Sequence, residues 1–290
     1  LAPLTPLREQ LYKEILGRIK QTDLSVPVRD RGFFYYNRTV EGQQYPIFAR
    51  KRGALDAAEQ VLLDLNEMAK GQSFMSVAAF TVSDDGNLLA YSYDSTGYRQ
   101  YAMRVKDLRT GALLPTIAER VTSVAWAADN RTLFYSVEHP VSKRSYRVYR
   151  HVLGEQKDTL LYEEKDERFS SYVGRSRSRE YVFMYVGSLT ADEQYYLPAT
   201  QPTSAWKQIA ARKENRELSA DHHGDQFYIG VNDTGRNFRL VTAPVSDPRE
   251  ANWKELIPHR ADVRLSGVTL FANHMVRSER EGGLPQIVVT

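Results

Sequence analysis

Residues 174–178 come closer than any other stretch to a hydrolase nucleophile motif. They read Gly-Arg-Ser-Arg-Ser, whereas a nucleophile elbow reads Gly-x-Ser-x-Gly and joins a strand to a helix. Ser178 replaces the second glycine, and no helical pattern follows. No histidine and acid can be assigned to Ser176 as partners in a catalytic triad. We therefore interpret these residues as a polar hairpin turn and assign no catalytic residue to this chain.

The histidines do not form a recognisable metal or cofactor motif. None of the six lies in a His-Glu-x-x-His pattern. His222 and His223 are adjacent, so in a strand their side chains would point to opposite faces; we predict a turn over residues 221–225. The sequence contains no phosphate-binding glycine loop and no cysteine, which excludes disulfides and thiolate ligands. We expect neither a metal nor a cofactor.

An acidic cluster follows Tyr162, where the sequence continues Glu-Glu-Lys-Asp-Glu. The simplest interpretation of such a run is a solvated loop. The alternative is an anionic surface that attracts a cationic substrate or contacts another domain. The candidate residues for substrate steering or interdomain contact are Glu163, Glu164, Asp166 and Glu167.

These residues belong to a repeated β unit, which residues 75–115 show most clearly. Apolar and aromatic segments of strand length alternate there with turn clusters that contain Gly86, Gly97 and Gly111. The unit recurs at a period of roughly 42–49 residues, in the range of propeller repeats. Four antiparallel strands joined by hairpins form one blade of a β-propeller.

The predicted fold class is therefore all-β. We predict a β-propeller of four-stranded antiparallel blades, with five blades and part of a sixth, preceded by a short N-terminal helix. The innermost strands are predicted to start near Phe80, Trp126, Val173 and Ala220. Outer strands are predicted at 60–66, 160–162, 206–209 and 253–257, the fourth strand of the 75–115 unit at 112–114, and the last copy from 268 to 290.

The N-terminal segment predicts an amphipathic helix over residues 6–20. Leu7, Leu11, Ile15 and Ile19 recur every four residues, and Thr5-Pro6 supplies an N-cap and a first-turn proline. We expect the apolar face to pack on the propeller or on a partner domain. The predicted domains are 1–30, helix and linker, and 31–290, a truncated propeller.

Composition excludes several classes of partner. The chain has 290 residues, 39 basic and 36 acidic, and a net charge of +3 without a long basic stripe, so we expect no nucleic-acid binding. No apolar run approaches the roughly 18–20 residues of a membrane helix, so we expect no membrane association. The chain shows no signal peptide, and we expect a cytoplasmic location, with the periplasm as the alternative.

Eight motifs in order along the chain resemble one family. They are Leu11–Gln21, Phe33–Tyr36, Arg99–Tyr101, His139–Val141, Tyr149–Gly154, Leu161–Asp166, Gly235–Phe238 and Trp253–Pro258. They are similar to the N-terminal part of the oligopeptidase B (protease II) branch of the prolyl oligopeptidase family of serine peptidases. The resemblance covers essentially the whole chain.

The resemblance implies that this chain is a non-catalytic part of a larger enzyme. Members combine a seven-bladed propeller with a C-terminal α/β-hydrolase domain that carries Ser, Asp and His. We expect the chain to be a fragment: the non-catalytic cap, or gating domain, of an oligopeptidase that cleaves short peptides after Lys or Arg. The implied partners are the hydrolase domain and peptide substrates. The open propeller edge is expected to permit self-association, and the chain alone is expected to be inactive.

Two alternatives remain open. A free-standing propeller would act as a protein-binding scaffold, although the Gly-His and Trp-Asp signatures of WD repeats are absent. A propeller enzyme with a site on its axis, such as a glycosidase, would need converging carboxylates. The predicted inner strands present Phe80, Trp126 and Val173 instead.

Overall fold

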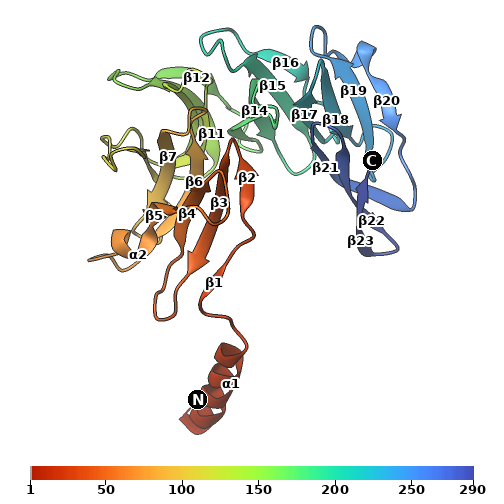
Figure 1. The fold of residues 1–290 in the computed structure, drawn as a ribbon. Helices are drawn as coiled ribbons and strands as arrows, with labels where there is room; N and C mark the ends of the chain where they lie inside the picture. Colours follow the sequence, from red (N-terminus) through yellow and green to blue (C-terminus); the bar gives the residue numbers. More distant parts are fainter. Residues whose placement is uncertain (1) are drawn as a thin grey trace. The chain divides into compact units, whose positions relative to one another are not determined.

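The computed structural model describes residues 2–290, which form two compact units (Figure 1). The first contains the chain up to Ser76 together with Asp94–Arg99. The second contains Val77–Tyr93 and Gln100–Thr290.

The first unit is built on one antiparallel sheet. β3 lies at its centre, because both β1 and β2 pair with one of its edges and β4 pairs with the other. The outer strand predicted at 60–66 is confirmed as β5, although it ends at Asp64, whose carboxylate caps the short helix α2. The strands are β1 (Asp23–Leu24), β2 (Val28–Asp30), β3 (Phe33–Thr39), β4 (Ile47–Arg52) and β5 (Glu59–Asp64), followed by α2 (Leu65–Met68).

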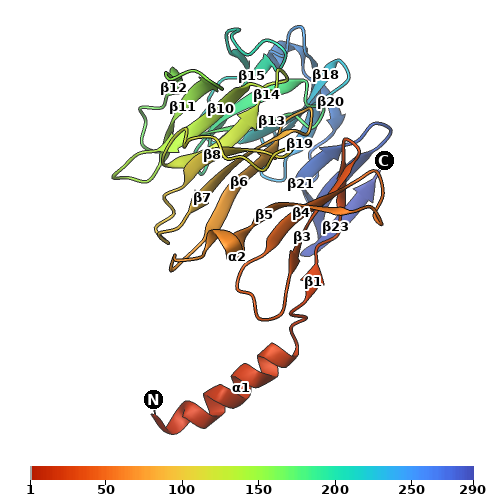
Figure 2. The same ribbon diagram turned by 60° about the vertical axis from the view of Figure 1, so that its left-hand side comes forward.

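The predicted N-terminal helix is present as α1 (Thr5–Gly17), drawn as one continuous helix in Figure 2. The predicted N-cap is wrong: Thr5 is already helical, because a 3-10 turn at Ala2–Leu4 leads into the helix and puts Leu4 at the cap. The helix buries none of its residues, and Leu7 and Ile15 are 52% and 60% exposed. Among residues 2–290 the apolar face of α1 is therefore left without a packing partner.

The second unit consists of five antiparallel sheets in chain order. The first is three-stranded, with β6 (Ser76–Val82), β7 (Leu88–Asp94) and β8 (Ala102–Asp107). Three four-stranded sheets follow: β9 (Val121–Trp126), β10 (Thr132–Glu138), β11 (Ser145–Val152) and β12 (Thr159–Glu163); β13 (Ser170–Arg175), β14 (Tyr181–Gly187), β15 (Asp192–Pro198) and β16 (Lys207–Ala210); β17 (Leu218–His223), β18 (Gln226–Val231), β19 (Arg239–Pro244) and β20 (Lys254–Ile257). The last is three-stranded, with β21 (Val263–Leu270), β22 (Met275–Glu281) and β23 (Leu284–Val289).

The four-stranded blade pattern is confirmed for the three middle sheets, and the outer strands predicted at 160–162, 206–209 and 253–257 are β12, β16 and β20. The fourth strand predicted at 112–114 is wrong. Only two isolated bridges, Met103 to Ala118 and Lys106 to Leu113, replace it. The segment still bonds β8 on both sides of Pro115, through the Leu114 amide to Val105 and the Ile117 amide to Met103, but its register changes between the two bridges, so no regular strand forms.

The predicted inner strands are the first strands of their sheets. Phe80, Trp126, Val173 and Ala220 lie in β6, β9, β13 and β17, although Trp126 ends its strand rather than starting it. First strands of consecutive sheets adjoin: the Val173 amide of β13 donates to Ser123 Oγ of β9 at 2.8 Å. In Figure 2, β13 and β14 lie beside β10 and β11.

Aromatic side chains fill the space between the β13–β16 and β17–β20 sheets. Phe227 is fully buried there, and its ring centroid lies 4.8 Å from that of Tyr196 and 5.5 Å from that of Tyr181. Edge-to-face contacts of this kind add to the stabilisation from apolar burial. The interface therefore depends on a few large side chains.

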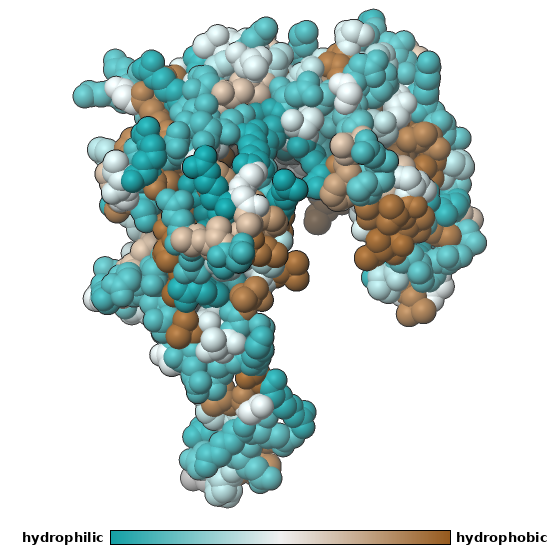
Figure 3. Space-filling model, viewed as in Figure 1, coloured by the Kyte–Doolittle hydropathy of each residue, from teal (hydrophilic) through white to brown (hydrophobic). Residues whose placement is uncertain are grey.

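The last sheet leaves apolar side chains uncovered. β23 pairs with β22 alone among the described strands, and Leu284, Ile287 and Val289 are 65%, 78% and 62% exposed. Figure 3 shows an apolar patch over this part of the surface. The free edge of β23 is an open edge through which two chains could pair, and self-association of this kind stays a prediction.

We predict that Phe227→Ala lowers the free energy of unfolding by about 3–5 kcal/mol, because it removes a buried ring and leaves a cavity between two sheets. Leu256→Ala is the control, since Leu256 is 48% exposed on β20 and its loss should cost about 0.5 kcal/mol. Urea denaturation of both variants measures the difference. Equal losses would show that the aromatic interface does not hold these sheets together.

Candidate functional site

The serine of the incomplete nucleophile motif lies in the β13–β14 hairpin, as predicted. Ser176 is 2% exposed, and its hydroxyl accepts the Tyr181 amide at 3.0 Å and bonds Ser178 Oγ at 2.8 Å. Ser178 Oγ in turn lies 2.8 Å from Nδ1 of His222. The hydroxyl of Ser176 therefore closes the turn.

The structure corrects the turn predicted at 221–225. Asp221, His222 and His223 belong to β17, which leaves only Gly224 and Asp225 as the turn, and Gly224 has a φ of +64°. His222 is 1% exposed, and burial lowers the pKa of its imidazole. Its Nε2 has no hydrogen-bond partner among residues 2–290, so no carboxylate orients this ring as a catalytic base.

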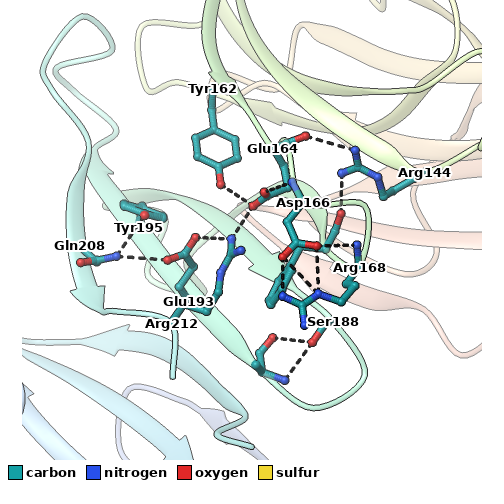
Figure 4. Close-up of polar contacts among 12 residues, drawn as sticks. Arg144, Tyr162, Glu164, Asp166, Arg168, Ser188, Glu193, Tyr195, Gln208 and Arg212 are labelled. Atoms are coloured by element: carbon teal, nitrogen blue, oxygen red, sulfur yellow. Dashed lines mark hydrogen bonds and ion pairs between the residues drawn. The ribbon is translucent and has the colours of Figure 1, made fainter. Parts of the chain in front are cut away.

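The acidic cluster is centred on Glu164, which directly follows β12 and is 6% exposed (Figure 4). One carboxylate oxygen accepts the Asp166 amide at 2.8 Å. The other accepts the Tyr162 hydroxyl at 2.8 Å and the Arg212 guanidinium. Arg212 lies between β16 and β17 and also bonds Glu193 of β15 at 2.8 Å. Glu164 thus ties its loop to the next sheet.

Electrostatics at this cluster favour the charged forms. Burial would raise the pKa of Glu164, but the Asp166 amide and the Arg212 guanidinium outweigh it, so the pKa lies below its ordinary value. Burial likewise opposes the charge on Arg212, yet the two carboxylates raise its pKa. The guanidinium carbon lies 3.5 Å from the ring centroid of Phe169, a cation–π contact.

The other three carboxylates of the acidic cluster surround the Glu164–Arg212 ion pair. Glu163 bonds Arg147 at 2.7 Å and is 34% exposed at its side chain. Asp166 bonds Arg168 at 2.7 Å, and that side-chain hydrogen bond lowers its pKa to about 2. Glu167 is exposed and forms no ion pair within the described part of the chain. Glu163 and Glu167 are thus the exposed members of the cluster, and of these two Glu167 is the one without an ion pair in the described part of the chain.

Three members of the network were not predicted. Arg144 donates to the carbonyl oxygens of Phe169 at 2.7 Å and Glu164 at 3.2 Å (Figure 4). Together with Arg212 and Glu193 it comes from a different repeat or loop from the acidic run. The pairing of Arg212 with Glu164 arises from the contact between two sheets, whereas Arg144 precedes β11 of the sheet that contains β12. The sequence carries no local signal for either contact.

A second ion-pair cluster joins the hairpin turns of three sheets. Asp84, after β6, pairs with Arg175 at 3.1 Å and with Arg179 at 3.3 Å, both from the β13–β14 hairpin. Arg175 also donates to the Trp126 carbonyl at the end of β9. This cluster fixes the ends of first strands relative to one another.

Residues 2–290 contain no group of three or more His, Asp or Glu side chains placed to hold a metal ion. No helix in the same range has the length and hydropathy needed to span a bilayer.

Repeated antiparallel sheets with adjoining first strands define the chain as a β-propeller domain. It belongs to the prolyl oligopeptidase family: the model of that family's N-terminal β-propeller domain matches residues 1–290. The resemblance drawn from the ordered motifs is confirmed.

Similar proteins share the whole of this chain. Dipeptidyl aminopeptidase BI of Pseudoxanthomonas mexicana is 40% identical over 308 residues, which cover 100% of this chain and 42% of that protein. Protease 2 of Moraxella lacunata is 31% identical, with 100% and 43% covered. The structure of oligopeptidase B from Leishmania major superposes with a TM-score of 0.90 at 26% identity, covering 99% of this chain and 42% of that one. The chain thus spans about two fifths of these relatives, which continue beyond the matched part.

We predict that Glu164→Gln lowers the free energy of unfolding at pH 7 by about 2 kcal/mol, because it removes a buried charge that Arg212 pairs with. A depressed carboxyl pKa stabilises the fold above pH 4.5, the ordinary value, and this stabilisation is lost as pH falls through the folded-state pKa. The difference between wild type and variant should therefore shrink in acid, as measured by urea denaturation at several pH values.

Glu163→Gln is the matched control, since its half-exposed pair with Arg147 should contribute no more than about 0.5 kcal/mol. A Glu164→Gln variant as stable as this control at pH 7 would contradict the role of the buried pair.

Proposed function

We propose that this chain is the non-catalytic cap of a serine oligopeptidase that cleaves short peptides after Lys or Arg. The match of residues 1–290 to the family's propeller domain supports this most directly. The relatives extend well beyond the matched part, in line with a catalytic domain that lies outside this chain. The cap would admit short peptides and exclude folded proteins from the catalytic domain.

Specificity for cationic residues is the finer part of this proposal. The similarity to Protease 2 and to oligopeptidase B supports it. The similarity to dipeptidyl aminopeptidase BI supports a second candidate, the release of dipeptides from free amino termini. The two differ in what the enzyme must recognise: a cationic side chain before the cleaved bond in the first, and a free α-ammonium group in the second.

We predict that the gene extended past the codon for Thr290 encodes an enzyme that hydrolyses an N-blocked Arg-containing chromogenic peptide, and that the 290-residue chain alone does not. The matched substrate replaces Arg with citrulline, which keeps the shape and removes the charge. Loss of at least about tenfold in kcat/KM on this replacement is expected for an ion-paired substrate side chain.

Rapid cleavage of the same peptide only when its amino terminus is free would contradict Lys/Arg oligopeptidase specificity and favour the dipeptidyl activity. Hydrolysis by the 290-residue chain that survives Ser176→Ala would contradict the non-catalytic assignment.

We propose further that the exposed members of the acidic cluster, Glu163 and Glu167, act on substrate or on the catalytic domain. Arg144, Arg147, Lys165, Arg168 and Arg212 accompany the cluster's carboxylates. The cluster is therefore nearly neutral as a whole, and long-range steering from it is weak. An exposed carboxylate such as that of Glu167 acts mainly over the ~8–10 Å that physiological salt leaves unscreened.

We predict that Glu167→Gln in the extended enzyme lowers kcat/KM for a doubly cationic peptide by about twofold at low salt. The loss should disappear as ionic strength rises, because salt screens the charge. Turnover across a salt series measures this, with Glu281→Gln, an exposed carboxylate on β22, as control. Unchanged rates and salt dependence would leave the cluster with its role in stability alone.

A further inference from the structure

A cavity of about 340 Å³ lies between the β17–β20 sheet and β21, beside each other in Figure 1. Its walls are apolar and polar in about equal measure, and the apolar part consists of Tyr228, Phe238 and Leu240 on one side and Leu265 and Leu270 on the other. The volume falls in the range of small-molecule sites, which are lined by apolar groups with a few polar ones.

Small residues at the centre of the interface create this cavity. Ser219 and Gly230 pair across β17 and β18, and they face Gly267 of β21, next to a break in strand register after Leu265. A methyl group at Gly267 would meet no atom within 4 Å, and one at Gly230 only the Ser219 carbonyl at 3.8 Å. The core of the preceding interface contains Phe183 and Tyr196 of the adjoining sheet instead.

Three carboxylates line the cavity without a cationic partner. Asp192 accepts the Leu218 amide at 3.1 Å, and Asp221 accepts the Arg177 amide at 2.9 Å. Glu217 accepts the Asn232 side-chain amide at 3.2 Å.

These hydrogen bonds come from neutral groups, and among residues 2–290 no Lys, Arg or His forms an ion pair with any of the three. The pKa of Asp192 is raised, first by burial and also by the neighbouring Glu217 carboxylate. Among the described residues, the cavity lining therefore holds three carboxylates without an ion pair and a single guanidinium, that of Arg264.

The one guanidinium in the lining is engaged elsewhere. Arg264 donates to the Arg236 carbonyl at 3.2 Å, and its guanidinium lies 5.0 Å from the ring centroid of Phe238. Solvent reaches the cavity, since Ser219 and Gly267 are exposed. An anionic ligand would meet three carboxylates here, whereas a cation would compensate them.

We propose that this cavity binds a small primary amine that carries an apolar group. The ammonium group bonds the carboxylates of Asp192 and Glu217, which are neighbours because Asp192 accepts the amide of Leu218, the residue after Glu217. The apolar group fills the space left by Gly230 and Gly267. A free amine and the amino-terminal residue of a short peptide share this chemistry. The site is independent of the proposed peptidase activity, because every residue in it belongs to this chain.

The probe is 2-phenylethylammonium, titrated into the 290-residue chain at low ionic strength and followed by ligand-detected NMR. We expect saturable binding with a Kd on the order of 1 mM, as the affinity per atom of small ligands implies. The isosteric alcohol, 2-phenylethanol, should bind at least about fivefold more weakly, since it lacks the charge. The anion 3-phenylpropionate should not bind.

The peptide source is distinguished by phenylalanylglycine amide and its N-acetyl form. Binding of the free dipeptide amide, abolished by acetylation, assigns the site to peptide amino termini. Binding of 2-phenylethylammonium alone assigns it to free amines. Both outcomes support the amine site.

Two kinds of variant test the geometry. Gly267→Val fills the cavity and should abolish binding, and Gly230→Ala, a smaller change, should weaken it. Asp192→Asn and Glu217→Gln keep the oxygen acceptors and remove the charge, so each should weaken binding by about fivefold. Glu281→Gln makes the same charge change outside the cavity and should have no effect.

The proposal fails if 2-phenylethylammonium shows no saturable binding, or if the alcohol binds as tightly. It also fails if the carboxylate variants bind like wild type, or if Gly267→Val, folded as judged by circular dichroism, binds unchanged. If Gly267→Val does not fold, Gly230→Ala and the two carboxylate variants decide the question.

Discussion

The sheets of the second unit bury their apolar faces against one another, and the rest of the structure depends on this packing. Backbone hydrogen bonds run mainly within each sheet, and a few join neighbouring sheets, such as those from the Ala128 amide to Ala199 and from the Leu265 amide to Asn237, both at 2.9 Å. Trp126, Phe183 and Phe227, all at most 1% exposed, are among the large side chains that supply the contact between sheets. In such repeat architectures each unit is stabilised mainly by its immediate neighbours, so the quality of every interface matters separately.

Apolar packing is not directional, whereas the ion pairs beside it are. Arg212 reaches carboxylates from two repeats, and Arg175 reaches Asp84 and the Trp126 carbonyl. Each guanidinium bonds groups that lie in fixed directions. These bonds therefore favour one alignment of the neighbouring sheets over others. The acidic cluster therefore has a structural role in Glu164 that is separate from any role of Glu163 and Glu167 toward a substrate.

The sequence predicted what depends on local pattern. Strand-length apolar runs and turn residues placed the first, second and third strands of each repeat, because these signals lie within a few residues of one another. The fourth strand after β8 failed around Pro115, where the segment changes its register with β8, which a favourable apolar run does not reveal. Contacts between repeats were beyond prediction: Glu164 and Arg212 are 48 residues apart, and only the stacking of sheets brings them together. The cavity was missed for the same reason, since Ser219 and Gly267 line it from two different sheets.

The unequal filling of the interfaces implies unequal local stability. β14 and β18 share an interface packed with aromatic rings, whereas β21 faces a hollow centre and belongs to a sheet of only three strands. Local opening requires less free energy where fewer apolar contacts are lost. Amide hydrogens of β21 and β22 should thus exchange with solvent through detachment of their sheet alone. Those of β14 and β18 should exchange only when the unit unfolds as a whole, so the last sheet behaves as a separate cooperative element.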